Sequence, residues 1–257
     1  ELYEAGVTLY RQGKLRLALE AFENVLSESP HHFAAFFHKG NSLLKLKYYE
    51  EALETFEEAS GLNPGHAGLW TNIGFALMKL ERFKQALEAF ERSISLNPVQ
   101  KNAWEGKEAV LKLIHQCEED LKESEAALNK NPPDACAFFE KGKLHVKLGD
   151  REQAKEAFGK VLEIKPENQE IWLLRGKVLF ESGLEKEALH AFEKATRYRP
   201  DLPEVWYEKG RVFLKLDNLR SAENAFKIAA DLWEKKGMKK RAEIARQKLR
   251  KLGSLKK

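Results

Sequence analysis

Apolar and polar residues alternate along much of the chain with the period of an amphipathic α-helix. In residues 67–98, apolar side chains recur every three or four positions, at Trp70, Ile73, Leu77 and Leu80 and then at Ala86, Leu87, Phe90 and Ile94. The polar pair Glu81 and Arg82 separates the two stripes, and Pro98 follows the second one. Because proline disfavours helix in the residue before it, Pro98 marks a helix end. The pattern therefore predicts two helices joined by a short turn.

The same pattern returns every 34 residues. One set of prolines keeps this spacing: Pro30, Pro64, Pro98, Pro132, Pro166 and Pro200. In the predicted first helices a set of glycines keeps it: Gly6, Gly40, Gly74, Gly142, Gly176 and Gly210. In the second helices it is kept by Ala18, Ala52, Ala86, Ala154, Ala188 and Ala222, and by Phe22, Phe56, Phe90, Phe158, Phe192 and Phe226. Small residues let two helix axes approach closely, so we expect Gly74 and Ala86 where the helices cross.

This pattern resembles the tetratricopeptide repeat, a 34-residue unit with characteristic kinds of residue at fixed places. The matching residues of one unit are Trp70, Gly74, Leu77, Ala86, Phe90, Ser93 and Pro98. The resemblance implies an all-α fold: a right-handed superhelical solenoid of stacked antiparallel helix pairs, with the first helices lining a concave groove. It covers an array of seven units, at residues 1–32, 33–66, 67–100, 101–134, 135–168, 169–202 and 203–236.

Residues 101–134 depart from the pattern. Glu108 and Asp120 stand where the other units have small residues, and Ser124 stands where they have phenylalanine. Small or apolar residues also continue at steps of three and four through the expected turn. Two structures fit this sequence: a loosened helix pair, which we favour, or one uninterrupted helix. In either case we expect the array to be weakest here.

The last segment, residues 237–257, is predicted to be a basic helix that caps the array. Residues 235–257 contain eleven Lys or Arg and one acid, Glu243. An apolar stripe with helical period runs along it: Met238, Ala242, Ala245, Leu249 and Leu252. A repeat array needs a polar-faced end to shield its core, so we expect this stripe to pack near Phe226 and Ala229. The positive charge then forms a solvated face, and an anion-binding tail is the weaker alternative.

A second stripe on each first helix faces away from the predicted core. In the resembled family it lines the groove that holds partner segments, so its members are our candidate binding residues: Phe37, Asn41, Asn72, Phe75, Phe139, Lys143, Lys177, Tyr207 and Arg211. The alternative is packing between adjacent first helices. Lys143, Lys177 and Arg211 share one equivalent position and form a basic line. Glu140 and Glu208, each three residues before a member of that line, offer pairing within the helix instead.

Some members of the resembled family clamp the C-terminal carboxylate of a chaperone with asparagines and cations. Asn41 and Asn72 stand at the two asparagine positions of that clamp. Phe37, Asn102 and Gly106 replace its cations, and without them a carboxylate has no charge partner. We therefore do not expect binding of a chaperone tail, and we keep Asn41 and Asn72 as candidates for hydrogen bonds to a peptide backbone.

The sequence carries no motif for catalysis or for a cofactor. It contains no Walker A loop, no GxGxxG or GxSxG segment and no HExxH motif. The histidines that follow Pro30 and Pro64 are expected to be solvated loop residues rather than metal ligands, and Cys117 and Cys136 form no CxxC pair. We expect no cofactor and no metal. No apolar run exceeds five residues and no secretory leader is visible, which indicates a cytoplasmic protein.

These features favour a non-enzymatic scaffold for protein–protein interactions, which holds a segment of another protein in its groove. The alternative is an architectural protein that self-assembles through an uncapped N-terminal end. The weakest of the three is binding of nucleic acid or membrane. Such a partner would bind the tail, because residues 235–257 contribute +10 to the formal net charge of +4 and leave −6 on the rest.

Overall fold

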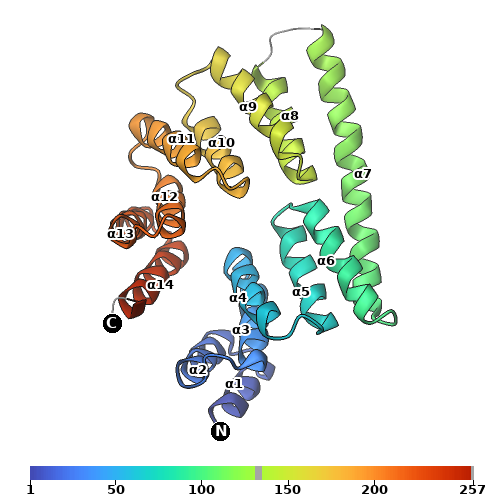
Figure 1. Ribbon diagram of the computed structural model, residues 1–257, viewed down its shortest axis with the longest axis vertical. Coiled ribbons are helices and arrows are strands. Elements are labelled where there is room, and N and C mark those ends of the chain that lie inside the picture. Colours follow the sequence, from blue (N-terminus) through green and yellow to red (C-terminus); the bar gives the residue numbers. More distant parts are fainter. Residues whose placement is uncertain (131–134, 256–257) are drawn as a thin grey trace. The chain divides into compact units, whose positions relative to one another are not determined.

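The computed structural model of the protein describes residues 1–130 and 135–255. Pro132 of the 34-residue series and the tail residues Lys256 and Lys257 lie outside these ranges. The helices are α1 (Leu2–Arg11), α2 (Leu15–Glu28), α3 (Phe33–Lys45), α4 (Tyr49–Leu62), α5 (Ala67–Lys79), α6 (Phe83–Leu96), α7 (Lys101–Lys130), α8 (Ala135–Leu148), α9 (Arg151–Ile164), α10 (Gln169–Glu181), α11 (Glu185–Tyr198), α12 (Pro203–Lys215), α13 (Leu219–Lys235) and α14 (Lys239–Leu255) (Figure 1). The described ranges contain no strand, so the predicted all-α fold is confirmed.

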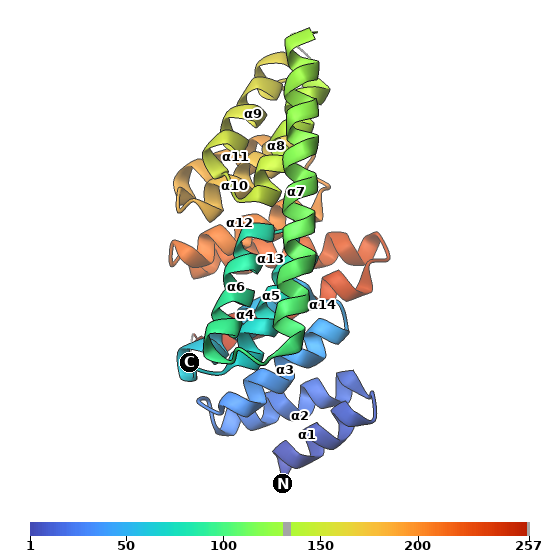
Figure 2. The ribbon, with the colours of Figure 1, turned by 90° about the vertical axis from the view of Figure 1, so that its right-hand side faces the viewer.

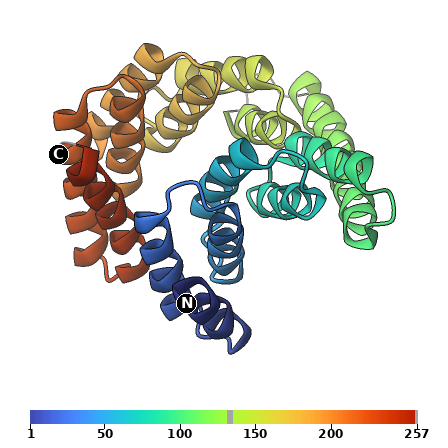
Figure 3. The same cartoon turned by 60° about the horizontal axis from the view of Figure 1, so that its bottom comes forward.

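The helices form two compact units, and the boundary between them falls inside α7. Unit 1 comprises Glu1–Glu119 with Lys147–Gly149, and unit 2 comprises Asp120–Val146 with Asp150–Lys257. Each helix packs on the next along the chain, from α1 to α6 in unit 1 and from α9 to α14 in unit 2. First helices also contact each other, as α3 contacts α5 and α10 contacts α12. Figure 3 shows these pairs as successive layers within each unit, as the periodic sequence predicts.

A buried phenylalanine fills the helix crossing in six helix pairs. Its ring lies against the glycine of its own pair, in the six couples Phe22–Gly6, Phe56–Gly40, Phe90–Gly74, Phe158–Gly142, Phe192–Gly176 and Phe226–Gly210. A Cβ atom added at these glycines would lie 2.3–2.7 Å from the ring. Only a hydrogen fits at that distance, which explains why glycine and phenylalanine repeat together.

The loops before the first helices are fixed by a recurring tryptophan. Its indole nitrogen donates to the carbonyl of the proline six residues earlier, at 2.8 Å in each of four cases: Trp70 to Pro64, Trp104 to Pro98, Trp172 to Pro166 and Trp206 to Pro200. The hydrogen bond satisfies the only polar atom of the indole and sets the direction of its ring.

The turns inside the pairs contain one residue with positive φ, again at the 34-residue spacing. Gly13, Gly149 and Gly183 occupy this position in three pairs. Lys47, Glu81 and Asp217 adopt the same conformation in three others, with φ of 55–65°. The left-handed conformation closes the first helix, and the chain accepts it even where the residue is not glycine.

Residues 101–130 form a single helix of 30 residues, so the loosened helix pair that we favoured is wrong. Figure 2 shows α7 as one uninterrupted rod. Its N-terminal half packs on α6 as a first helix does, since a Cβ at Gly106 would lie 2.4 Å from the Phe90 ring. Its C-terminal half packs on α8 as a second helix does, and the Ser124 hydroxyl donates to the carbonyl of Ala137 at 3.2 Å. Thus α7 unites the two helices of one repeat without the turn.

A recurring ion pair between residues 16 positions apart also shows that the first half of α7 packs as a first helix and the second half as a second helix. Second helices offer a glutamate to a lysine of the following first helix, in the pairs Glu23–Lys39, Glu91–Lys107 and Glu125–Lys141, at 2.8–3.0 Å. Lys107 is the first-helix member of one pair and Glu125 the second-helix member of the next. Both therefore keep their place in the repeat although the chain between them is helical.

The C-terminal helix α14 packs on α13. Ala242 and Ala245 are buried in a cluster with Ala229, Ala230 and Trp233. Further along, Leu252 is buried with Phe226, and Leu249 packs against them. These residues lie where the sequence placed them. Met238 does not: it precedes the helix, its side chain is 42% exposed, and its inclusion in the apolar stripe is wrong.

Several of the basic residues of α14 form ion pairs. Arg241 pairs with Glu204 of α12, Arg246 with Glu234 of α13, and Arg250 with Glu243 within α14. Such pairs on an exposed face use part of the positive charge on contacts within the chain. Among the described helices, none combines the length and the apolar character that a membrane crossing requires.

Candidate functional site

The nine candidate binding residues lie on five helices. Four of the residues belong to unit 1 and five belong to unit 2. In unit 1, Phe37 and Asn41 lie on α3, and Asn72 and Phe75 on α5. In unit 2, the five lie on α8, α10 and α12: Phe139, Lys143, Lys177, Tyr207 and Arg211. We call these nine residues the first-helix stripe. All of them are half-buried. Each therefore takes part in packing and keeps an exposed edge, and their binding role stays a prediction.

The aromatic members of the stripe rest on the buried phenylalanines of the helix crossings. Ring centroids lie 6.5, 5.2, 6.3 and 5.3 Å apart in the pairs Phe37–Phe56, Phe75–Phe90, Phe139–Phe158 and Tyr207–Phe226. Such tilted and edge-to-face contacts are favourable, and they restrict the stripe rings to one orientation. A partner segment would meet rings that are already ordered, which lowers the entropic cost of binding.

Asn41 and Asn72 are brought together in unit 1. The Asn72 side-chain nitrogen donates to the Asn41 side-chain oxygen at 2.6 Å, which links α3 to α5. The amide nitrogen of Asn41 and the carbonyl oxygen of Asn72 then remain, one donor and one acceptor that no other described side chain engages. A peptide backbone presents the complementary acceptor and donor.

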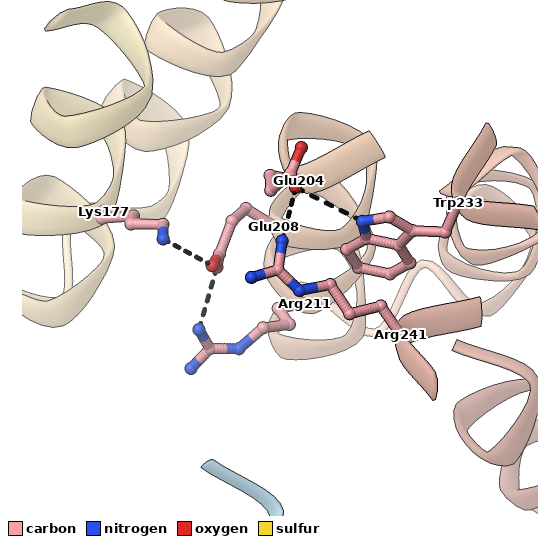
Figure 4. Close-up of polar contacts among 6 residues, drawn as sticks. All are labelled: Lys177, Glu204, Glu208, Arg211, Trp233 and Arg241. Carbon is pink, nitrogen blue, oxygen red and sulfur yellow. Dashed lines mark hydrogen bonds and ion pairs between the residues drawn. The ribbon is translucent and has the colours of Figure 1, made fainter. Parts of the chain in front are cut away.

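In unit 2, one buried carboxylate joins two members of the basic line (Figure 4). Glu208 of α12 lies 2.8 Å from Arg211 on the same helix and 3.5 Å from Lys177 on α10. The Glu208 side chain is 9% exposed, whereas those of Lys177 and Arg211 are 42% and 36% exposed. The carboxylate thus contacts both cations from the buried side, and part of each cationic side chain stays exposed.

The third cation of the basic line pairs within its own helix, as the sequence allowed. Lys143 lies 3.0 Å from Glu140 and 5.0 Å from the centre of the Phe139 ring. Arg211 also lies over an aromatic ring, with its guanidinium carbon 5.1 Å from the centre of the Phe180 ring. The stripe of unit 2 therefore carries three cations, two nearby carboxylates and adjacent aromatic surface.

The sequence did not reveal the neighbouring contact of Glu204. Its carboxylate accepts hydrogen bonds from the Trp233 indole at 3.3 Å and from Arg241 at 2.8 Å (Figure 4). Glu204 lies on α12, Trp233 on α13 and Arg241 on α14, so one acid connects three helices beside the basic line. No local signal marks this group, because its members are 29 and 37 residues away from Glu204.

Two histidines of first helices are withdrawn from solvent, His38 in part and His145 almost fully. In unit 1, the His38 ring of α3 stacks on the Phe22 ring and meets the Tyr10 ring edge-on. The ring centroids are 5.8 Å apart in both pairs. Burial lowers the pKa of His38, and the nearby Arg11 lowers it further. In unit 2, Nδ1 of His145 lies 3.6 Å from Asp150. Burial lowers the pKa of His145, and Asp150 opposes part of that effect. Burial disfavours the charged imidazolium in both places.

Of the histidines that follow Pro30 and Pro64, His31 is exposed in the loop as predicted, whereas His32 and His66 differ from the prediction. Nδ1 of His32 accepts from the Ala35 backbone nitrogen at 3.1 Å, and Nδ1 of His66 accepts from that of Leu69 at 3.0 Å. They are half-buried N-caps of α3 and α5 rather than solvated loop residues. Within residues 1–130 and 135–255, no three side chains of His, Cys, Asp or Glu gather as metal ligands would.

Comparison with known proteins identifies the repeat. The family model described as Tetratricopeptide repeat matches residues 3–67, 139–203 and 186–236, and a second model with the same description matches residues 67–98. The segment left between these matches, residues 99–138, includes all of α7. No curated protein matches the chain.

Three solved structures are similar to this chain at low sequence identity. The TPR2AB domain of yeast Sti1, in its pHSP90 complex, has 18% identity and a TM-score of 0.45, over 98% of this chain and 97% of that one. A tetratricopeptide repeat protein from Parabacteroides merdae has 17% identity and a TM-score of 0.42, over 95% and 97%. MamA protein has 20% identity and a TM-score of 0.38, over 78% and 91%.

Proposed function

The chain belongs to the tetratricopeptide-repeat family, and on this basis we propose that it is a non-enzymatic scaffold whose first-helix stripe binds an acidic segment of a partner protein. The observation that carries the proposal is the arrangement of Lys177 and Arg211 over the buried Glu208. A buried carboxylate beneath two half-exposed cations fixes their positions without neutralising them both. The cluster of these three residues keeps a net charge of +1.

A carboxylate of the partner fits the outer side of these cations. Hydrogen bonds between ionised groups are about twice as strong as neutral ones, and an arginine holds a carboxylate with two parallel bonds. An isolated exposed ion pair contributes only about 0–1 kcal/mol. Useful affinity therefore requires several such contacts along the line from Lys143 to Arg211, together with apolar contacts on Phe139, Phe180 and Tyr207.

The spacing of the helices sets the spacing of the acids. Packed helices lie about 8–10 Å apart, and an extended chain advances about 3.3 Å per residue. A segment that crosses α8, α10 and α12 therefore meets a new cation about every third residue. We expect the partner to carry acidic residues at this interval, with apolar residues between them.

A fluorescent synthetic peptide with glutamate at every third position tests the proposal. Its affinity for the full chain is compared with that of the same peptide carrying glutamine at those positions. We expect the acidic peptide to bind more tightly, and the variant Lys143→Gln with Lys177→Gln to weaken it about tenfold, equal to about 1.4 kcal/mol. Glutamine removes the charge, keeps the first two methylenes of the lysine and leaves Glu208 paired with Arg211.

The matched control is Lys186→Gln, which removes a lysine from the second helix α11. This variant should bind the acidic peptide as the unmodified chain does. Added salt should weaken binding to the unmodified chain much more than to the double variant, since exposed charges are screened. Equal affinity for the acidic and the neutral peptide, or equal loss in the control, would show that the basic line is not the binding site.

A further inference from the structure

Arg175 on α10 is a cation whose repeated partner is replaced by glycine. The recurring glutamate–lysine pair, which joins a second helix to the following first helix, places Lys141 2.8 Å from Glu125. One repeat later, the equivalent residues are Arg175 and Gly159. Since Gly159 on α9 has no side chain, this repeat keeps the cation of the pair and has no carboxylate to meet it.

No other acid of the chain takes over this role. Among the described residues, no acidic side chain pairs with Arg175, and its buried Nε donates to no acceptor. A buried donor without an acceptor is unfavourable, and more so when it is charged. A Cβ added at Gly159 would have no atom within 4 Å, so the space beside α9 is open. Arg175 is therefore a half-buried cation with room for a carboxylate from elsewhere.

Arg175 lines a hollow of about 440 Å³ between α10 and α11. The rest of the lining is Trp172, Leu179, Lys186, Glu187, His190 and Ala191. The guanidinium carbon of Arg175 lies 5.8 Å from the centre of the Trp172 ring, and the Trp172 indole is fixed by its bond to Pro166. The hollow thus offers an ordered aromatic surface with a cation beside it, and its volume is in the usual range of ligand sites.

The charged residues on the α11 side of the hollow lie at its rim. Lys186, Glu187 and His190 are all exposed. Lys186 and Glu187 carry opposite charges, and exposed charges contribute little to binding. Arg175 is half-buried, and an arginine holds a carboxylate with two parallel hydrogen bonds. The selection of an anion therefore depends on Arg175.

This hollow is separate from the first-helix stripe. Arg175 and the stripe residue Lys177 are two residues apart on α10, and an α-helix turns by about 100° per residue. Their side chains therefore leave the helix about 200° apart, on nearly opposite sides. A ligand in the hollow leaves the stripe free for a second partner segment.

We propose that the hollow binds a glutamate side chain of a partner protein, with the glutamate carboxylate on Arg175 and a neighbouring apolar residue on Trp172. The chain itself shows the fit, because in three other places a glutamate side chain reaches the cation at this position of the repeat. The half-buried Trp172 favours a side chain of a protein over a free carboxylate ion, since the residue beside the glutamate can pack on the indole.

The Nε–Hε signal of Arg175 in nitrogen-15 spectra of the full chain tests the proposal. The probe is a blocked tripeptide of leucine, glutamate and leucine, and its control has glutamine in the middle. We expect the glutamate peptide to shift the signal saturably and the glutamine peptide to bind about tenfold more weakly. Arg175→Gln identifies the signal by removing it. Equal shifts with both peptides, or a shift with inorganic phosphate and none with the glutamate peptide, overturn the proposal. The signal reports on Arg175 alone, so the result is independent of binding at the first-helix stripe.

Returning a glutamate to α9 gives a second test. Gly159→Glu should pair with Arg175 as Glu125 pairs with Lys141, and the glutamate peptide should then no longer shift the Arg175 signal. Gly61→Glu adds the same charge at an exposed glycine of α4 and should leave peptide binding unchanged. Gly159→Glu should also melt at a higher temperature than Gly159→Gln, and Arg175→Gln should remove that difference. A Gly159→Glu chain that still binds the peptide, or that melts as Gly159→Gln does, overturns the proposal.

Discussion

At the scale of single residues, the periodic positions follow from the volume of one ring. Phe90 lies between two glycines, Gly74 on α5 and Gly106 on α7, and a Cβ at either position would fall within 2.7 Å of the ring. Gly74 belongs to the 34-residue series, and the sequence predicts its role. Gly106 does not belong to it, and the sequence shows only that a cation is missing there. Its packing role depends on the approach of the next helix, which the period alone does not describe.

This contact predicts a contrast between two substitutions. Gly106→Ala places a methyl group 2.4 Å from the Phe90 ring and should destabilise unit 1 by about 1–3 kcal/mol, the usual cost of overpacking. Gly61→Ala, at a glycine of α4 with no atom within 4 Å of the new Cβ, should instead gain up to about 1 kcal/mol from helix propensity. Urea unfolding measures both. If both substitutions change the free energy of unfolding equally and with the same sign, the Phe90 ring must move aside for the new methyl group.

The contacts of the candidate site were only partly predictable. The sequence placed Asn41, Asn72, Lys177 and Arg211 on the exposed sides of first helices, because that follows from helical period. It also indicated that Glu208 pairs with Arg211, three residues further along the same helix. The Asn41–Asn72 bond and the second cation on Glu208 join different helices. Such contacts depend on side-chain reach across a helix interface, which no spacing within the chain specifies.

At the scale of elements, α7 shows why the turn was mispredicted. We took the regular turn as the default, and the regular turns need no glycine: Lys47, Glu81 and Asp217 adopt positive φ there. The equivalent residue of α7 is His115, which stays helical. The packing at the helix crossing decides whether the chain folds back into a pair. With Glu108, Asp120 and Ser124 in place of Gly, Ala and Phe, folding back gains little packing. An unbroken helix keeps its backbone hydrogen bonds instead.

The length of α7 gives a direct test. Spin labels at the exposed positions Lys101→Cys and Ala126→Cys, in a Cys136→Ser background, should lie about 38 Å apart, since a helix rises about 1.5 Å per residue. Cys117 is buried, which protects it from labelling. Two packed helices of a pair would instead bring the labels within about 10–20 Å. Pulsed electron–electron double resonance distinguishes these two distances. A dominant short distance would mean that α7 folds back.

The start of α14 shows the limit of reading a stripe by period alone. Met238 falls on the apolar side of the helical pattern, yet it precedes the first residue of the helix, and its carbonyl accepts the first bond, from the Ala242 nitrogen at 3.1 Å. Gly237 before it has φ of 73° and turns the chain between α13 and α14. The turn directs Met238 outwards, whereas Ala242 and Ala245, one and two turns later, are buried.

At the scale of the whole molecule, the repeats were predictable and the division into two units was not. The repeats follow from residues that recur every 34 positions. The boundary falls between Glu119 and Asp120, inside a continuous helix, where no composition change marks it. Each unit has its own buried phenylalanines and its own histidine with a pKa lowered by burial, His38 in unit 1 and His145 in unit 2. Each unit therefore contains one histidine that links its stability to pH.

Acidification should destabilise both units in the same pH range. Burial lowers the pKa of His38 and of His145 in the folded chain, whereas an unfolded histidine has a pKa of about 6.5. Below that value the unfolded chain binds more protons than the folded one, so the free energy of unfolding falls as the pH falls. The contribution of each histidine is fully present above about pH 6.5 and is lost as the pH falls towards its folded pKa. The slope is at most about 1.4 kcal/mol per pH unit for each histidine.

The charged neighbours determine how the two units differ in this response. Arg11 reinforces the effect of burial on His38, whereas Asp150 and Glu125 favour the protonated form of His145 and Lys141 opposes it. Urea unfolding between about pH 7.5 and 5.5, followed for each unit by hydrogen exchange, should show a steeper loss where the pKa is lower. His38→Gln should flatten the slope of unit 1 only, and His145→Gln that of unit 2 only. His31→Gln, at an exposed histidine, is the control. If neither substitution changes its slope, carboxylates rather than these two histidines control the response to acid.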